Sequence, residues 1–168
     1  KRGWHGINID LNPLTIELFI FARGKDININ AAISDIEESK KLYFMDELNT
    51  QNTLEANHLL FLKNEHNIKD EEISQQEIKT KRLDKILDNY NFNDIDFMNI
   101  DVEGHELNVL NSIDFFKYRI KFICIEMIDH NDHAKLINEK LNEVLLKNNY
   151  ALEKKIGFNF IFKKDDQI

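Results

Sequence analysis

The spacing of apolar residues near the start of the chain predicts a strand, a helix and a second strand. Residues 6–10 carry apolar side chains at every second position, as a strand does. Asn12 and Pro13 follow as a cap and first-turn pair, and helical spacing continues up to Gly24. Alternation then returns over residues 27–33, which we expect to form one strand.

The middle of the chain has a weaker pattern. Residues 41–45 predict a short strand. We expect an irregular insertion over residues 46–77, because this stretch is polar apart from an apolar patch at 59–62. From Thr80 the apolar residues recur at helical spacing, which predicts a helix there.

The second half of the chain again alternates between strands and helices. Residues 95–100 predict a strand, and a helix is expected to begin near Gly104. Residues 120–128 contain the most hydrophobic strand candidate, as expected of a central parallel strand that is buried on both faces.

A long amphipathic helix and a hairpin are predicted to close the chain. The helix carries Leu136, Leu141 and Leu145 on one side, and residues 151–156 and 158–162 form the hairpin. This alternation predicts an α/β fold with a mostly parallel open sheet, helices on both faces and a C-terminal antiparallel hairpin. With 168 residues, 42% of them hydrophobic, we expect one domain over residues 1–168.

Charge and composition narrow the function. The chain has 22 basic and 30 acidic residues, a formal charge of -8, which disfavours nucleic acid and anionic lipid surfaces as partners. No apolar run approaches the roughly 20 residues that cross a bilayer. The single Cys124 lies in an apolar run and predicts a reducing, cytoplasmic setting.

Acidic residues stand where predicted strands end, and ligands of open α/β sheets bind beyond these ends. Asp10 ends the first strand, Asp35 follows the second, and Glu126 lies in the strand at 120–128. An acidic side chain at the position of Asp10 can accept both ribose hydroxyl protons of an adenosine. It can equally be a helix N-terminal carboxylate that the backbone at residues 12–14 satisfies, and both interpretations stay open.

Residues 101–106 place three carboxylates and one imidazole at a predicted strand-to-helix turn, where Gly104 allows a close backbone approach. This set suits a sulfonium cofactor, a metal ion or a substrate hydroxyl. The alternative is a first-turn cluster that only interacts with the helix dipole. His130 and His133 have the spacing of a metal-ligand pair, but a solvated polar loop is the favoured interpretation, so we expect no metal site.

These motifs together resemble the FkbM methyltransferase family. The most specific is DVEGHE at residues 101–106, and the resemblance spans nearly the whole chain. The other matching segments are residues 3–6, 9–13, 30–34, 83–84, 109–110, 125–126 and 157–162.

The resemblance implies a Rossmann-like methyltransferase that uses S-adenosylmethionine to methylate a hydroxyl on a sugar or other small metabolite. By position, Asp10 would hold the ribose, with Asn12 beside it. Ser34 and Asp35 would lie near the adenine. Asp101 would lie beside the methionine moiety and the transferred methyl group.

The resemblance also implies candidates for catalysis. Asp101 lies at the reacting group, and Glu103 and Glu126 would shape the substrate side. His105 or Glu126 is the candidate general base.

Members of the family carry a strand and a glycine turn of the type DIGAxxG ahead of the segment that corresponds to Gly3-Trp4. The sequence starts at Lys1 without them, so we expect this first strand to be missing. Two alternatives to the enzyme remain. One is a non-catalytic Rossmann-like interaction module. The other is a metal-dependent hydrolase that uses Asp101, Glu103, Glu126 and His130.

Overall fold

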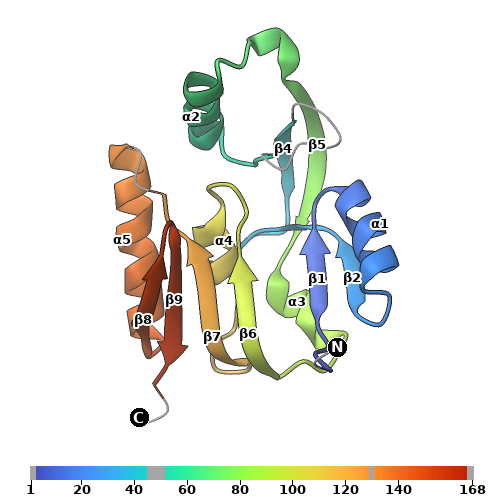
Figure 1. Cartoon of the computed structure of the whole chain (residues 1–168), viewed down its shortest axis with the longest axis vertical. Coiled ribbons are helices and arrows are strands. Elements are labelled where there is room, and N and C mark those ends of the chain that lie inside the picture. Colours follow the sequence, from blue (N-terminus) through green and yellow to red (C-terminus); the bar gives the residue numbers. More distant parts are fainter. Residues whose placement is uncertain (1–2, 45–51, 129–130, 166–168) are drawn as a thin grey trace.

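The protein has a mixed α/β architecture, seen in a computed structural model that describes residues 3–44, 52–128 and 131–165 (Figure 1). The chain begins with the predicted strand, helix and strand: β1 (Ile7–Asp10), α1 (Pro13–Ala22) and β2 (Ile27–Asn30). The side-chain oxygen of Asn12 accepts the N–H of Leu14 at 2.9 Å and caps the helix, as its sequence position indicates. β1 and β2 pair in parallel.

The segment expected to be one strand over residues 27–33 is two strands in different sheets. β2 pairs with β1, whereas β3 (Ala32–Ile33) pairs in parallel with β5 (Ser74–Lys81). Between them the N–H of Ala31 donates to the carbonyl of Asp10 at 3.0 Å. On its other edge β5 pairs antiparallel with β4 (Ser39–Phe44).

The expectation of an irregular insertion over residues 46–77 is corrected for the part that the structure describes. That part contains α2 (Ala56–His66), a short 3-10 helix (Asp70–Glu72) and the first half of β5. The sequence did not predict β5, because backbone pairing with β4 stabilises this strand and Thr80 is its one buried residue. The strand therefore has no apolar alternation. Residues 46–51 lie outside the described ranges.

Thr80 therefore lies in β5, and the helix predicted to begin there is α3 (Leu83–Asp88). α3 buries Leu83, Ile86 and Leu87, which are the apolar positions that predicted it.

A four-stranded sheet forms the second half of the protein. Its order is β6 (Asp94–Ile100), β7 (Arg119–Glu126), β9 (Asn159–Lys164) and β8 (Tyr150–Ile156). β6 and β7 are parallel, and β9 is antiparallel to both of its neighbours. The most hydrophobic predicted strand is thus central, and the C-terminal hairpin is confirmed.

Two helices pack with this sheet around the main core. They are α4 (Glu106–Asn111) and α5 (Asp132–Lys147), and α5 contacts both α4 and β8. Asn131 caps α5 by accepting the N–H of Ala134 at 2.8 Å. The core members with no exposed surface are Leu110, Ile120, Ile123, Ile125 and Leu145.

The expectation of a mostly parallel sheet is not confirmed. In the described ranges three strand pairs are parallel and three antiparallel, and they form three separate sheets. There β1 is hydrogen-bonded to β2 alone and β6 to β7 alone, so each keeps one unpaired edge. β1, β6 and β7 run in the same direction, and their carboxyl ends lie on the side of the molecule where α2 stands (Figure 1).

Candidate functional site

A cavity of about 170 Å³ lies at the carboxyl ends of β1 and β6. Asp10 is the last residue of β1 and Asp101 directly follows β6, and both line the cavity. Two acidic groups that are 91 positions apart in the sequence therefore share one hollow, as ligand binding at strand ends requires. The remaining lining residues are Ile9, Leu11, Asn12, Thr15, Ala31, Ala32, Ile33, Asn52, Leu54, Val102, Glu103 and His105.

The position of Asp10 is compatible with both interpretations that its place in the sequence left open. One carboxylate oxygen accepts the backbone N–H of Asn12 at 2.7 Å, so the carboxylate helps to satisfy the start of α1. The same residue lines the cavity. Burial raises its pKa, and the hydrogen bond from Asn12 opposes that rise. Asn12 also lines the cavity while its side chain caps α1.

The turn after β6 is held in an unusual backbone conformation. Glu103 has a φ of 53° and Gly104 a φ of 93°, both in the left-handed region. The side chain of Thr53 donates to the carbonyl of Glu103 at 2.7 Å, and the Glu103 carboxylate lies 3.0 Å from Nε2 of His58. The segment that precedes and begins α2 thus fixes this turn.

Asp101 is the least compensated carboxylate of the turn. Burial raises its pKa, and the nearby charge of Glu103 adds to the rise. A positive charge placed in this cavity would relieve both effects, so the part of the cavity near Asp101 favours a cationic ligand.

The side chain of His105 is buried, with 1% of its surface exposed. Its Nδ1 lies 2.6 Å from a carboxylate oxygen of Glu55, and its Nε2 lies 3.1 Å from the hydroxyl of Ser34. Both ring nitrogens are therefore engaged. His105 therefore links Glu55 to Ser34 and also lines the cavity.

Asp35 is linked to His105 through the hydroxyl of Ser34. Ser34 is fully buried, and its hydroxyl lies 3.1 Å from a carboxylate oxygen of Asp35. The side chain of Asn108 donates to the same oxygen at 2.9 Å. Burial opposes ionisation of Asp35, but the hydrogen bonds from Asn108 and Ser34 outweigh it and lower the pKa. Neither Ser34 nor Asp35 is among the described residues that line the larger cavity.

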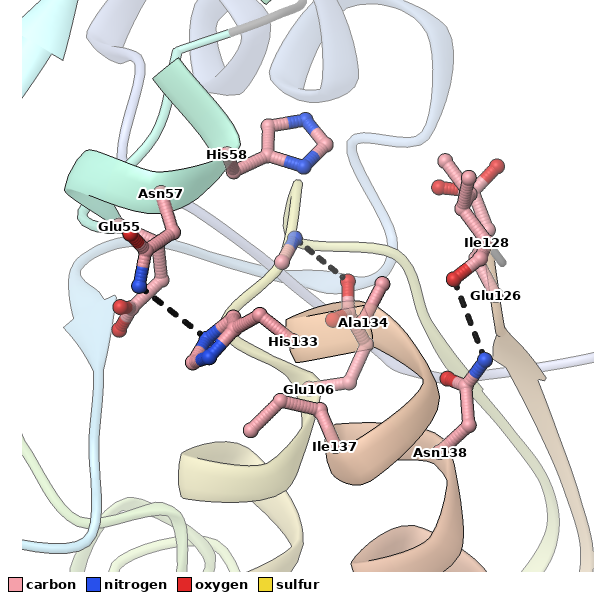
Figure 2. A pocket seen from close by; sticks show the side chains of 11 residues that line it. Glu55, Asn57, His58, Glu106, Glu126, Ile128, His133, Ala134, Ile137 and Asn138 are labelled. Carbon is pink, nitrogen blue, oxygen red and sulfur yellow. Dashed lines mark hydrogen bonds between the residues drawn. The ribbon is translucent and has the colours of Figure 1, made fainter. Parts of the chain in front are cut away.

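A second cavity of about 50 Å³ lies beside the turn (Figure 2). Glu126, at the end of β7, lines it. Burial, followed by the charges of Asp101, Glu103 and Glu106, raises the pKa of Glu126 to about 7. The other lining residues are Glu55, Asn57, His58, Gly104, Glu106, Ile128, His133, Ala134, Ile137 and Asn138.

Glu106 behaves largely as the helix-terminus carboxylate that the sequence left open as an alternative. It is 4% exposed, and one oxygen accepts the N–H groups of Val102 and Gly104 at 3.2 and 3.1 Å. Burial raises its pKa, against the effect of these hydrogen bonds.

His133 joins α5 to α2. Its Nε2 lies 3.3 Å from the side-chain nitrogen of Asn57, and both residues line the smaller cavity (Figure 2). His130 lies outside the described residues. In the described part of the chain, no group of three or more His, Cys, Asp or Glu side chains is placed to hold a metal ion.

Four residues of the site come from residues 46–77, for which the sequence predicted no function. Glu55, His58 and Thr53 contact the turn after β6, and Asn52 lines the larger cavity. The side-chain oxygen of Asn52 is buried and has no hydrogen-bond partner in the described ranges. No local pattern could have found these residues, because their partners lie 45 or 50 positions away.

The fold and the cavities define an α/β protein whose candidate site gathers carboxylates at the carboxyl ends of parallel strands. A family model described as "Methyltransferase FkbM domain" matches residues 1–152. The chain therefore belongs to the FkbM methyltransferase family. Comparisons with curated proteins and with solved structures found no match.

None of the helices in the described ranges combines the length and the apolar character that crossing a membrane requires.

Proposed function

We propose that this chain acts as an S-adenosylmethionine-dependent O-methyltransferase and that the larger cavity receives the cofactor. The observation that carries the proposal is that Asp10 and Asp101 line the same cavity. A carboxylate at the end of β1 can accept the hydroxyl protons of a ribose. Among the described residues no positive partner stabilises the ionised form of Asp101, so Asp101 suits the neighbourhood of a sulfonium cation.

The described residues fit this cofactor in two further respects. The buried, unpartnered oxygen of Asn52 is an acceptor that an adenine amino group or a ribose hydroxyl could satisfy. Ile9, Ile33 and Leu54 add an apolar wall suited to the flat base. When bound, S-adenosylmethionine supplies a methyl group activated by the positive sulfur, and the chain supplies binding and orientation.

The methyl acceptor in this proposal is a hydroxyl on a sugar or other small metabolite. Family membership supports methyl transfer, and the carboxylates around the two cavities support an acceptor that binds through hydroxyl groups. The setting we propose is the cytoplasm, on the grounds of the single Cys124 in its apolar strand and of the chain's net negative charge.

A Rossmann-like sheet is part of the same proposal. β1 and β6 run in the same direction and each keeps one unpaired edge in the described ranges (Figure 1). One further parallel strand inserted between them would pair with both edges and join the β1–β2 sheet to the four-stranded sheet.

The proposal is tested by calorimetric titration of the complete gene product with S-adenosylmethionine and S-adenosylhomocysteine. We expect binding of both, and we expect Asp10→Asn to weaken it about tenfold or more through loss of charge-assisted hydrogen bonds. Asp94→Asn is the matched control, because Asp94 pairs with Arg119 at the exposed amino end of β6. No binding of either ligand by the folded protein would refute the proposed function.

A further inference from the structure

The two cavities share one backbone turn. Of residues 101–106, Asp101, Val102, Glu103 and His105 line the larger cavity, whereas Gly104 and Glu106 line the smaller one. Glu103 and Gly104, whose φ angles lie in the left-handed region, are part of this turn. Methyl transfer requires the acceptor to approach the methyl carbon in line with the departing sulfur, from the side away from it. A second compartment next to the cofactor's cavity meets that requirement.

The size of the smaller cavity limits what can enter it. A volume of about 50 Å³ accommodates a small functional group of an acceptor, such as a hydroxymethyl or amino group. Ile128, Ala134 and Ile137 provide apolar contact, and Asn57 and Asn138 provide amide groups (Figure 2). No lysine or arginine is among the described residues that line it. Such a lining disfavours phosphate and carboxylate groups.

Glu126 differs from the other carboxylates of the smaller cavity in having no hydrogen-bond or ion-pair partner within the described part of the chain. Glu55 lies against His105, and Glu106 accepts two backbone N–H groups. No residue in the described ranges forms a hydrogen bond or an ion pair with the carboxylate of Glu126. A carboxylate that is free at the edge of a partly closed cavity is available to a ligand.

Building on the proposed function, we propose that the smaller cavity binds the hydroxyl-bearing end of an uncharged or cationic acceptor and that Glu126 is the general base. The acceptor oxygen forms a bond to the methyl carbon, the bond from that carbon to sulfur breaks, and its electron pair stays on the sulfur. The proton of the acceptor hydroxyl passes to the carboxylate of Glu126, so that charge and atoms balance.

The charges around Glu126 couple this base to the cofactor. Asp101, Glu103 and Glu106 raise the pKa of Glu126, and His58 opposes them. Glu55 from the segment before α2 and His133 from α5 also face the cavity. A sulfonium cation in the larger cavity would offset the three carboxylates and lower the pKa of Glu126. Glu126 would then be ionised, and able to take a proton, when the methyl donor is bound.

The coupling is measured by carbon NMR titration of the complete gene product labelled at glutamate carboxyl carbons, with Glu126→Gln to assign the resonance. We expect Glu126 to titrate near pH 7 in the complex with neutral S-adenosylhomocysteine. We expect a lower pKa in the complex with cationic S-adenosylmethionine. Titration at about 4.3, the ordinary value for glutamate, or the same pKa in both complexes would overturn the proposal.

Calorimetry separates this outcome from failure of the proposed function. Glu126→Gln should bind S-adenosylhomocysteine within about twofold of the parent protein, because Glu126 does not line the larger cavity. If the parent protein does not bind S-adenosylhomocysteine, the proposed function fails. If it binds and Glu126 behaves as an ordinary carboxylate, only the assignment of the base fails.

The acceptor class is tested with three probes titrated into the S-adenosylhomocysteine complex: methyl glucoside, glucosamine and glucose 6-phosphate. We expect the first two to shift the amide resonances of Ile128, Ala134 and Asn138 and the phosphate to leave them unchanged. Methyl transfer to a probe that binds should fall about a hundredfold or more in Glu126→Gln. Shifts caused by the phosphate alone, or by none of the probes, would overturn the assignment of this cavity.

Discussion

Replacing Gly104 with alanine tests how tightly α2 is held against the turn of residues 101–106. A Cβ atom at Gly104 would lie 2.9 Å from Cβ of His58 and 3.1 Å from its Cγ. The first of these atoms is close to the backbone of α2 and cannot swing away. The φ of 93° at Gly104 also disfavours any residue with a side chain.

The two effects have separate magnitudes. A left-handed conformation costs an ordinary residue about 1 to 2 kcal/mol. Overpacking by one carbon against a fixed neighbour costs about 1 to 3 kcal/mol. We therefore expect Gly104→Ala to lower the free energy of unfolding by about 2 to 5 kcal/mol and to weaken S-adenosylhomocysteine binding, because the turn carries Asp101.

Urea unfolding followed by circular dichroism measures the loss, and two other glycines serve as controls. Gly157 has a φ of 60° but open space around its Cβ position, so Gly157→Ala reports the conformational cost alone. Gly6 has neither constraint, so Gly6→Ala should change stability little. The variant that combines Gly104→Ala with His58→Ala should recover the steric part. If Gly104→Ala is no more destabilising than Gly157→Ala, close packing between α2 and the turn is refuted.

Two further predictions concern stability. The hydroxyl of Ser112 is buried, accepts the N–H of Leu83 at 3.2 Å and donates to the carbonyl of Val109 at 2.6 Å, so Ser112→Ala should cost about 1 to 3 kcal/mol in urea unfolding. A change below a few tenths would contradict this. Because folding raises the pKa of Glu126 to about 7, its contribution to stability is lost as pH rises from the unfolded value toward 7. Glu126→Gln should therefore stabilise the ligand-free protein more at pH 8 than at pH 5, and equal effects at both would rule out the raised pKa.

The segment before and within α2 has a larger part in the site than its sequence indicates. Thr53, Glu55 and His58 all hold the turn after β6, and they reach it from a part of the chain with little apolar pattern. Variants of these three residues should disturb both cavities together, because the turn lines both of them.

The sequence by itself determined the elements whose apolar spacing is strong. The strand–helix–strand at the start, the central β7 and the closing hairpin follow from alternation or helical periodicity, which burial in a core enforces. It also indicated Asp10, Asp101 and Glu126 as candidates, because they stand where strands meet loops. The motif at residues 101–106 led to the family that the comparison confirms.

Only the tertiary structure decided how these pieces meet. β5 has one buried residue and exists through its backbone pairing with β4, an interaction that leaves no periodic trace in the sequence. The enclosure of His105 between Glu55 and Ser34 depends on contacts across 50 and 71 positions, which local patterns do not encode. Residues 101–106 line two cavities only once α2 lies against the turn, where His58 contacts Glu103 and leaves no room for a side chain at Gly104.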